Sequence, residues 1–259
     1  MTDHTQTNII TLTRHVFETQ RLHPEASGDL TLLLNAVQLG CKFVESCVRK
    51  SRLVNLIGLA GNQNVQGEDQ KKLDVLSNEM FVNAIRASNK VAMMVSEEDE
   101  EAIFVEGSDG RYCITFDPLD GSSNIDAGVN VGTIFGIFKL KGSESDAVRA
   151  EDILMKGSEI KVAGYCMYGS SCNIVISLGV GVVNGFTLDP ALGEFILTHP
   201  NIRIPKRGKI YSINEGNSLY WDDATRHYIE SLKNGPGGRK PYSARYIGSM
   251  VADVHRTLL

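Results

Sequence analysis

Two apolar runs in this chain end abruptly in carboxylates, and this pattern constrains the fold more than any other feature. Residues 91–95 lead into Glu97 and Glu98, and residues 112–116 lead directly into Asp117. Short continuous apolar runs of this kind are typical of buried strands. Because open sheets bind ligands beyond the ends of their strands, we expect the acidic side chains to gather at one sheet edge. The pattern therefore predicts a sheet with a polar site where these strands end.

The segment Asp117-Pro118-Leu119-Asp120-Gly121-Ser122-Ser123 joins two carboxylates to a step that can open a helix. Asp117 and Asp120 offer the hard oxygen ligands that Mg²⁺ or Mn²⁺ takes, and Pro118 stiffens the bend. The amides of residues 121–123 would face an anion, since a helix N-terminus presents unpaired N–H groups. This combination indicates metal-assisted phosphoryl chemistry. The alternative is an ordinary Asp-Pro turn followed by a helix start.

Four carboxylates are expected to converge here, on Glu97, Glu98, Asp117 and Asp120. Without cations they would repel one another and burial would raise their pKa values, so bound divalent ions are the simplest way to keep them ionised together. The cluster therefore predicts two or more metal ions. For the run 97–101 taken alone, the alternative is a solvated acidic loop.

A third acidic segment, residues 67–74, precedes a helical pattern. That pattern is an apolar stripe with spacings of three and four, made of Leu73, Leu76, Met80, Phe81, Ala84 and Ile85. We expect a mobile loop over residues 52–72 that leads into this helix. Glu68 and Asp74 would orient and deprotonate a metal-bound water. The alternative for Asp74 is an acid favoured by the helix dipole in a first turn.

Composition favours a globular enzyme and excludes several function classes. The 259 residues are 42% hydrophobic and 22% charged, with a net charge of −5 and a pI near 5.7, which argues against general nucleic-acid binding. No apolar run is long enough to cross a bilayer, and residues 1–8 are polar, so we expect a cytoplasmic protein. Five cysteines without a Cys-x-x-Cys pair predict reduced, mostly buried thiols. The serine-hydrolase elbow, the zinc-protease motif and the P-loop are all missing from the sequence.

The remaining patterns predict a layered α/β fold, with helices packed outside one substantial sheet. Helices are expected at residues 9–21, 31–50 and 73–87, and strands at 91–95, 103–105, 112–116, 131–139, 162–168, 174–177 and 180–188. Two prolines in the stretch 198–205 indicate a boundary between a first domain, 1–200, and the start of a second, 201–259. An apolar helix pattern begins near Ser249 and runs to Leu259 without a stop signal, which predicts a chain that lacks its C-terminal part.

These residues carry a resemblance to the class 1 fructose-1,6-bisphosphatases, within the inositol-monophosphatase-like superfamily of metal-dependent phosphatases. The resemblance covers nearly the whole chain. Its blocks, beyond the turn at 117–122, are residues 71–77, 131–137, 188–190, 193–195, 212–216, 244–246 and 248–253. It implies a sugar phosphatase fold and a phosphoric monoester hydrolase. The implied reaction releases the 1-phosphate of fructose 1,6-bisphosphate, leaving fructose 6-phosphate, a step of gluconeogenesis.

The resemblance also assigns roles to residues of the active site. The metals, Mg²⁺ with Mn²⁺ or Zn²⁺ as alternatives, would be held by Glu97, Glu98, Asp117, Asp120 and the Leu119 carbonyl. Water would be activated by Glu68, Asp74 and Glu98, and the 1-phosphate would be bound by Gly121, Ser122 and Ser123. The sugar and its 6-phosphate would contact Asn214, Arg245, Tyr246 and Met250. Because the family supplies this arginine to a neighbouring subunit, the resemblance implies a homotetramer.

An allosteric AMP site is implied near the N-terminus, at Ser27, Gly28, Asp29, Leu30, Thr31, Arg111, Tyr112 and Lys139. The first five precede an apolar helix whose exposed amides could hold a phosphate. The alternative for Ser27 or Asp29 is an ordinary helix cap.

Two departures from the family pattern leave alternatives open. Asn217 stands where many members carry Tyr, so one phosphate-binding hydroxyl would be absent or replaced by an amide. The early end at Leu259 would remove a further metal-ligand Glu, together with a Tyr and a Lys for the substrate. The alternatives are a sedoheptulose bisphosphatase or inositol phosphatase, or a disabled fragment that binds AMP or other subunits as a regulator.

Overall fold

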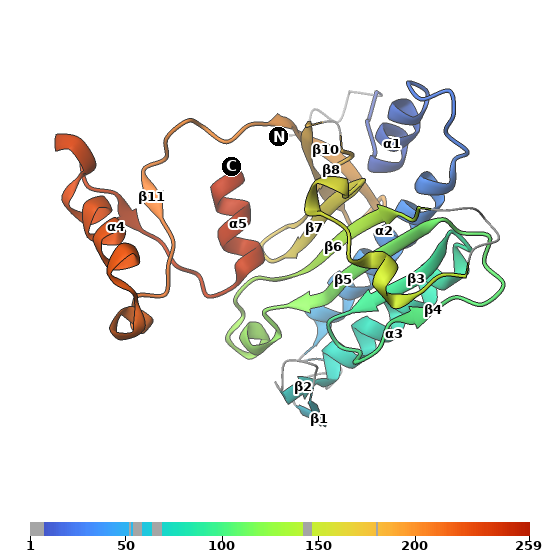
Figure 1. Cartoon of the computed structure of the whole chain (residues 1–259), viewed down its shortest axis with the longest axis horizontal. Helices are drawn as coiled ribbons and strands as arrows, with labels where there is room; N and C mark the ends of the chain where they lie inside the picture. The colour runs from blue at the N-terminus through green and yellow to red at the C-terminus, as the bar shows by residue number, and fades with distance from the viewer. Residues whose placement is uncertain (1–7, 52, 54–58, 64–68, 142–146, 180) are drawn as a thin grey trace.

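The computed structural model describes residues 8–51, 53, 59–63, 69–141, 147–179 and 181–259, and its centre is an eight-stranded sheet (Figure 1). Its strand order is β10-β9-β8-β7-β6-β5-β3-β4. The strands are β3 Val91–Ser96, β4 Ile103–Phe104, β5 Tyr112–Asp120, β6 Val131–Lys139, β7 Val162–Tyr168, β8 Cys172–Ser177, β9 Val183–Asp189 and β10 Glu194–Ile202. Neighbouring strands are antiparallel except β3 and β5, which run parallel.

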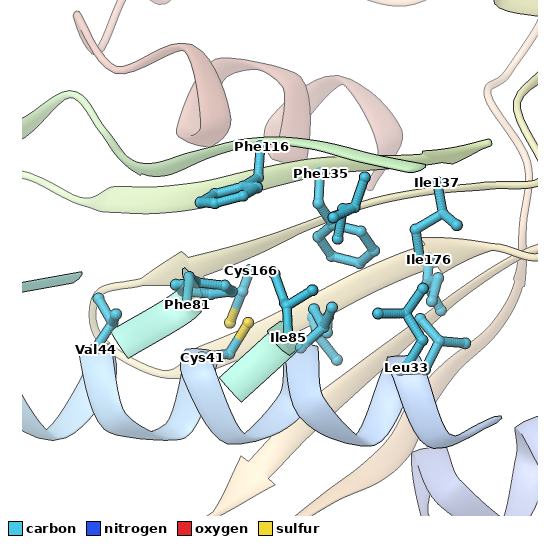
Figure 2. Close-up of a cluster of buried hydrophobic side chains, with 14 of the residues drawn as sticks. Leu33, Cys41, Val44, Phe81, Ile85, Phe116, Phe135, Ile137, Cys166 and Ile176 are labelled. Carbon is cyan, nitrogen blue, oxygen red and sulfur yellow. The ribbon is translucent and has the colours of Figure 1, made fainter. Parts of the chain in front are cut away.

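Helices α2 (Asp29–Lys50) and α3 (Lys72–Ala87) cover one face of the sheet, with α1 (Leu12–Gln20) beside them (Figure 1). Their apolar stripes meet alternate strand residues in the largest core cluster, because successive side chains of a strand point to opposite faces. Figure 2 shows part of it, including Leu33 and Cys41 of α2, Phe81 of α3, and Cys166 of β7. Layers of helix and sheet confirm the α/β prediction.

The opposite face of the sheet is covered in separate places. Helix α5 (Met250–Leu258) packs Val251 and Ala252 against Tyr165 and Met167 of β7. Near β3 and β5, Ile153 of the 3₁₀ turn η2 (Ala150–Ile153) packs against a small cluster of Met93, Cys113 and Leu140. A further 3₁₀ turn, η3, spans Gly157–Glu159.

The chain after β10 forms a smaller unit beside the sheet, visible at the left of Figure 1. Its elements are β11 Ile210–Tyr211, η4 Glu215–Tyr220, α4 Asp223–Asn234, η5 Pro236–Gly238 and β12 Ser243–Ala244. Sequence patterning does not predict α4, although Asp222 is an N-cap whose carboxylate accepts from the Thr225 amide at 2.6 Å. None of the helices in the described ranges combines the length and the apolar character needed to cross a bilayer.

Several predicted boundaries differ from the structure. Strand β5 continues to Asp120 instead of ending at residue 116, because Asp117 and Asp120 still pair with Ile134 and Gly132 across an irregularity in register. Part of the segment predicted as a mobile loop pairs instead as β1 (Leu59–Gln63) and β2 (Asp69–Lys71). Strand β10, which sequence patterning does not predict, runs into the stretch expected as a domain boundary, and the division at residue 200 stays a prediction.

Candidate active site

The carboxylates that follow β3 and β5 lie together at one edge of the sheet. The two strands are parallel neighbours, with Ser96 paired to Phe116, and the Glu97 amide donates to the Phe116 carbonyl at 3.1 Å. Glu97 and Asp117 both line a cleft of about 370 Å³, together with Met250 of α5. Parallel pairing therefore brings these carboxylates to the same place, at the carboxyl ends of the strands.

The turn from Asp117 to Asp120 is held by hydrogen bonds at several points. The Asp117 carboxylate accepts from the Leu119 amide at 2.9 Å, and the Pro118 carbonyl accepts from the Thr133 hydroxyl at 2.8 Å. The Asp120 carboxylate accepts from the Val251 amide of α5 at 3.2 Å. These contacts orient the carboxylates before any ligand arrives.

Burial makes these carboxylates costly to ionise. It raises the pKa of Asp117 to about 7, with further contributions from Asp120, Glu97 and Asp74, while the Leu119 amide opposes the rise. Burial also raises the pKa of Asp120, against the hydrogen bond from Val251. A cation among these oxygens would offset this cost, and hard oxygen donors suit Mg²⁺ and similar ions.

The donor set therefore fits divalent metals, although its side chains do not already form a coordination sphere. In the described part of the chain, no group of three or more His, Cys, Asp or Glu side chains has an arrangement that could hold an ion as it stands.

The step after Asp120, which is predicted to bind phosphate, is a 3₁₀ helix and not the start of an α-helix. Gly121 has φ 77°, a conformation that favours glycine, and η1 spans Ser122–Ala127. The Ser122 hydroxyl donates to the Asp74 carboxylate at 3.1 Å, and this contact joins residues 48 positions apart. Asp74 is buried in the first turn of α3. The predicted phosphate cradle and a predicted water-activating acid are thus in direct contact.

The acidic loop after β3 is fixed by two residues that sequence reasoning missed. The Ser96 hydroxyl donates to the Asn78 side chain at 2.7 Å and accepts from the Glu98 amide at 3.2 Å. Asn78 also donates to the Asp99 carboxylate at 2.9 Å. Because Asn78 lies on α3 near Asp74, this network ties Glu98 to the same helix. Glu68 lies outside the described residues.

A cleft of about 620 Å³ opens beside the turn. Asp120, Gly121, Tyr246 and Met250 line it, so predicted metal, phosphate and sugar contacts share one space. The buried Ser249, which sequence reasoning also missed, is a further lining residue. Asn214 and Arg245, which are also predicted to bind the substrate, lie elsewhere. Neither residue lines this cleft: Asn214 caps η4 by accepting from the Gly216 amide, and the Arg245 guanidinium donates to the Ala244 carbonyl. Asn217 lies within η4.

The residues predicted to bind a nucleotide also gather, at the N-terminus of α2. Gly28 has φ 91° and precedes Asp29, whose carboxylate accepts from the Ser27 hydroxyl at 2.6 Å. Tyr112 of β5 pairs with Lys139 of β6, and burial and Asp29 raise the pKa of this tyrosine.

Lys90 also lies at the N-terminus of α2, although the sequence did not predict it among the nucleotide-binding residues. It forms an ion pair with Asp29 at 2.8 Å, and this contact and Ser27 lower the pKa of the aspartate, with a smaller contribution from Lys139. The Thr31 hydroxyl donates to Gln20, Arg111 accepts a backbone bond from Leu140, and Leu30 packs against the core.

Comparison with known proteins places this geometry in a family. The family model described as "Fructose-1-6-bisphosphatase, N-terminal domain" matches residues 10–200, and the model of the C-terminal domain matches residues 204–259. A cytosolic fructose-1,6-bisphosphatase of Oryza coarctata is 61% identical over 255 residues, which are 98% of this chain and 73% of the relative. The cytosolic enzyme of Solanum tuberosum is 59% identical over 99% of this chain and 75% of its own length.

Solved structures agree with this result. The holo form of Leishmania major fructose-1,6-bisphosphatase is 45% identical and superposes with a TM-score of 0.89, covering 97% of this chain and 76% of that one. The T-state structure of the same protein is 44% identical, with a TM-score of 0.82 and coverage of 97% and 75%. The family predicted from the sequence is confirmed: this chain belongs to the fructose-1,6-bisphosphatases.

Proposed function

We infer that this chain hydrolyses the 1-phosphate of fructose 1,6-bisphosphate, releasing fructose 6-phosphate and inorganic phosphate in gluconeogenesis. The observation that carries this inference is the identity of 58–61% to cytosolic fructose-1,6-bisphosphatases along almost the whole chain. The acidic edge of the sheet opens beside a cleft that suits a sugar phosphate. Since the relatives are named cytosolic, we place this chain in the same compartment.

Fructose-1,6-bisphosphatases are metal-dependent phosphatases, and in this chain Glu97, Glu98, Asp117, Asp120 and the Leu119 carbonyl would hold the cations. Mg²⁺ is the proposed ion, with Mn²⁺ or Zn²⁺ as alternatives. When bound, such ions offset charge on phosphoryl oxygens and acidify water. Asp74, Glu98 and Glu68 would take the proton of the attacking water. The contact from Ser122 fixes the Asp74 carboxylate next to the phosphate cradle, which supports its role as the base.

Substrate binding divides between the two ends of the sugar. The amides of Gly121, Ser122 and Ser123 would bind the 1-phosphate, and Tyr246 and Met250 would contact the sugar across the cleft. Asn214 and Arg245 would bind at the 6-phosphate end. Arg245 is exposed and does not line the cleft of its own chain, which suits a residue supplied to a neighbouring subunit of a homotetramer. A planar guanidinium is suited to that task because it meets phosphate oxygens bidentately.

Phosphate release from fructose 1,6-bisphosphate in excess Mg²⁺ tests the reaction directly, with sedoheptulose 1,7-bisphosphate and inositol 1-phosphate as parallel substrates. We expect the fructose bisphosphate to be hydrolysed fastest. Faster hydrolysis of another of these phosphates would reassign the substrate. AMP binding with no hydrolysis of any of them would instead identify a regulatory protein.

AMP is proposed as an allosteric inhibitor bound at the N-terminus of α2. The 22-residue helix places its positive dipole end and exposed amides at Asp29–Thr31, where a phosphate is favoured. Tyr112 of β5 and Lys139 of β6 both interact electrostatically with Asp29 at this point, and Arg111 immediately precedes β5. Two cationic side chains and a hydroxyl would therefore meet the nucleotide from the sheet side.

Replacing Lys139 with Ala is expected to raise the AMP concentration for half-inhibition about 10-fold, since one charge-assisted hydrogen bond contributes roughly 1.5–3 kcal/mol. Turnover without AMP should be unchanged, because Lys139 lies at the far end of β6 from the pairing of Gly132 with Asp120. Lys141→Ala is the matched control, as Lys141 is exposed and pairs with Glu159. Equal loss of AMP sensitivity in both variants would contradict the proposed site.

A further inference from the structure

Helix α5 brings a backbone donor to a carboxylate of the active site. Its first residues line the substrate cleft, and the Val251 amide donates to the Asp120 carboxylate at 3.2 Å. The helix sits directly on β6 at this point, because a Cβ added to Gly132 would lie 2.7 Å from the Val251 side chain. Gly132 in turn pairs with Asp120. The position of α5 therefore decides how Asp120 is oriented.

The far half of α5 has a polar anchor of its own. His255 Nδ1 lies 3.0 Å from the Tyr165 hydroxyl of β7, and the two rings meet edge to face at 5.9 Å between centroids and 90° between planes. Burial raises the pKa of Tyr165, so the phenol keeps its proton and can donate. Tyr165 also packs against Val251 and Ala252 within one apolar cluster. The same tyrosine thus contacts both the anchor and the start of the helix.

We propose that Tyr165 and His255 form a positioning pair that seats α5 on the sheet and so holds the Val251 amide on Asp120. Neither residue lines the cleft, and the pair acts through the helix. Its role in catalysis rests on the proposed function, because Asp120 is there a metal ligand. Its role in holding the Val251 amide against Asp120 is independent of that proposed function.

Acid should weaken this anchor. His255 accepts the hydrogen bond only while its Nδ1 is unprotonated. Burial lowers the pKa of His255, and His199 of β10 lowers it further. Tyr165 of β7 also faces it, through the contact of its hydroxyl with Nδ1. The folded state therefore binds fewer protons at this histidine than the unfolded chain does. The hydrogen bond that holds α5 against the sheet weakens as the pH falls below the ordinary histidine pKa near 6.5.

Hydrogen exchange at the Val251 amide, in metal-free protein at pH 7.5 and without substrate, measures how firmly α5 is held against Asp120. Tyr165→Phe keeps the ring and removes the hydroxyl, and His255→Phe keeps an aromatic ring and removes the acceptor. Each is expected to speed exchange about fivefold and to raise the Mn²⁺ dissociation constant by a similar factor, as loss of one neutral hydrogen bond predicts. His255→Asn, which retains an acceptor close to the Nδ1 position, should restore most of the wild-type values.

The double variant of Tyr165→Phe and His255→Phe should be no worse than either single variant, because both remove the same bond. Tyr228→Phe is the control, since this tyrosine is exposed on α4. If Tyr165→Phe fails to fold by circular dichroism, the two His255 variants still decide the question. Unchanged exchange at Val251 in every folded variant, or fully additive effects in the double variant, would overturn the proposal. Absence of sugar-phosphate hydrolysis by the wild type would refute the proposed function and leave the exchange result standing.

Discussion

Asp117→Asn is expected to abolish phosphate release and, in the same protein, to stabilise the metal-free fold at pH 8. Loss of a charged ligand removes several kcal/mol of charge stabilisation, so turnover should fall by roughly 10³-fold or more. The stability gain has a separate cause. Burial and the neighbouring carboxylates raise the pKa of Asp117 to about 7, so above that pH the folded protein carries an unfavourable buried charge.

The sign of the pH dependence follows from proton binding. The folded state holds the Asp117 proton up to about pH 7, whereas the unfolded chain releases it near the ordinary value of about 3.9. Wild-type stability from this group therefore falls as pH rises between these values. Asparagine removes this loss, and we expect a gain on the order of 1–3 kcal/mol at pH 8 that shrinks as the pH approaches 4.

Urea unfolding in the presence of a chelator at pH 8, 6 and 4 checks the stability half of this prediction, and phosphate release in excess Mg²⁺ checks the other. Asp109→Asn is the control, because Asp109 is exposed in the loop before β5. It should change neither quantity. A less stable Asp117→Asn protein at pH 8, or one with full turnover, would refute the assigned role of the carboxylate.

Asp74→Asn is expected to reduce kcat by about 10²–10⁴-fold with little change in KM, since a general base contributes that much to a rate. The amide oxygen of asparagine can still accept from the Ser122 hydroxyl, which now contacts the Asp74 carboxylate at 3.1 Å, so the phosphate cradle should keep its shape. What is lost is the capacity to take a proton.

Steady-state kinetics at several Mg²⁺ concentrations separates the loss of a base from the loss of a metal. The Mg²⁺ concentration for half-maximal rate should stay near the wild-type value. Glu79→Gln is the matched control, because Glu79 lies on the exposed side of the same helix. An unchanged kcat in Asp74→Asn would remove this residue from the mechanism. A large rise in the Mg²⁺ requirement would make it a metal ligand instead.

Sequence patterns predict most of the central sheet and its helices, because each is specified locally. Apolar runs such as residues 131–139 match β6 without change, and α3 begins within one residue of its predicted start. The failures have physical causes. Strand β10 contains Pro200, a residue tolerated there because the strand is at the sheet edge, and exposed side chains follow its buried start.

The site was predictable where its residues carry charge, and less so where neutral groups orient them. Carboxylates at strand ends are visible in the sequence. The support that Asn78 and Ser96 give to the acidic loop depends on contacts between α3 and β3, and neither residue belongs to a distinctive motif. The Val251 amide has no side-chain signature at all, so its contact with Asp120 is invisible before the fold is known.

That contact has a consequence for how the protein acquires its activity. Asp120 and Val251 are 131 residues apart, so a folding intermediate that has formed β5 and β6 but not α5 has an acidic turn with one partner missing. Such an intermediate would bind metal less well than the finished fold, and metal in solution would selectively stabilise molecules that have completed their folding. Divalent ions would then favour the completed fold over this intermediate, in addition to serving the chemistry of the site.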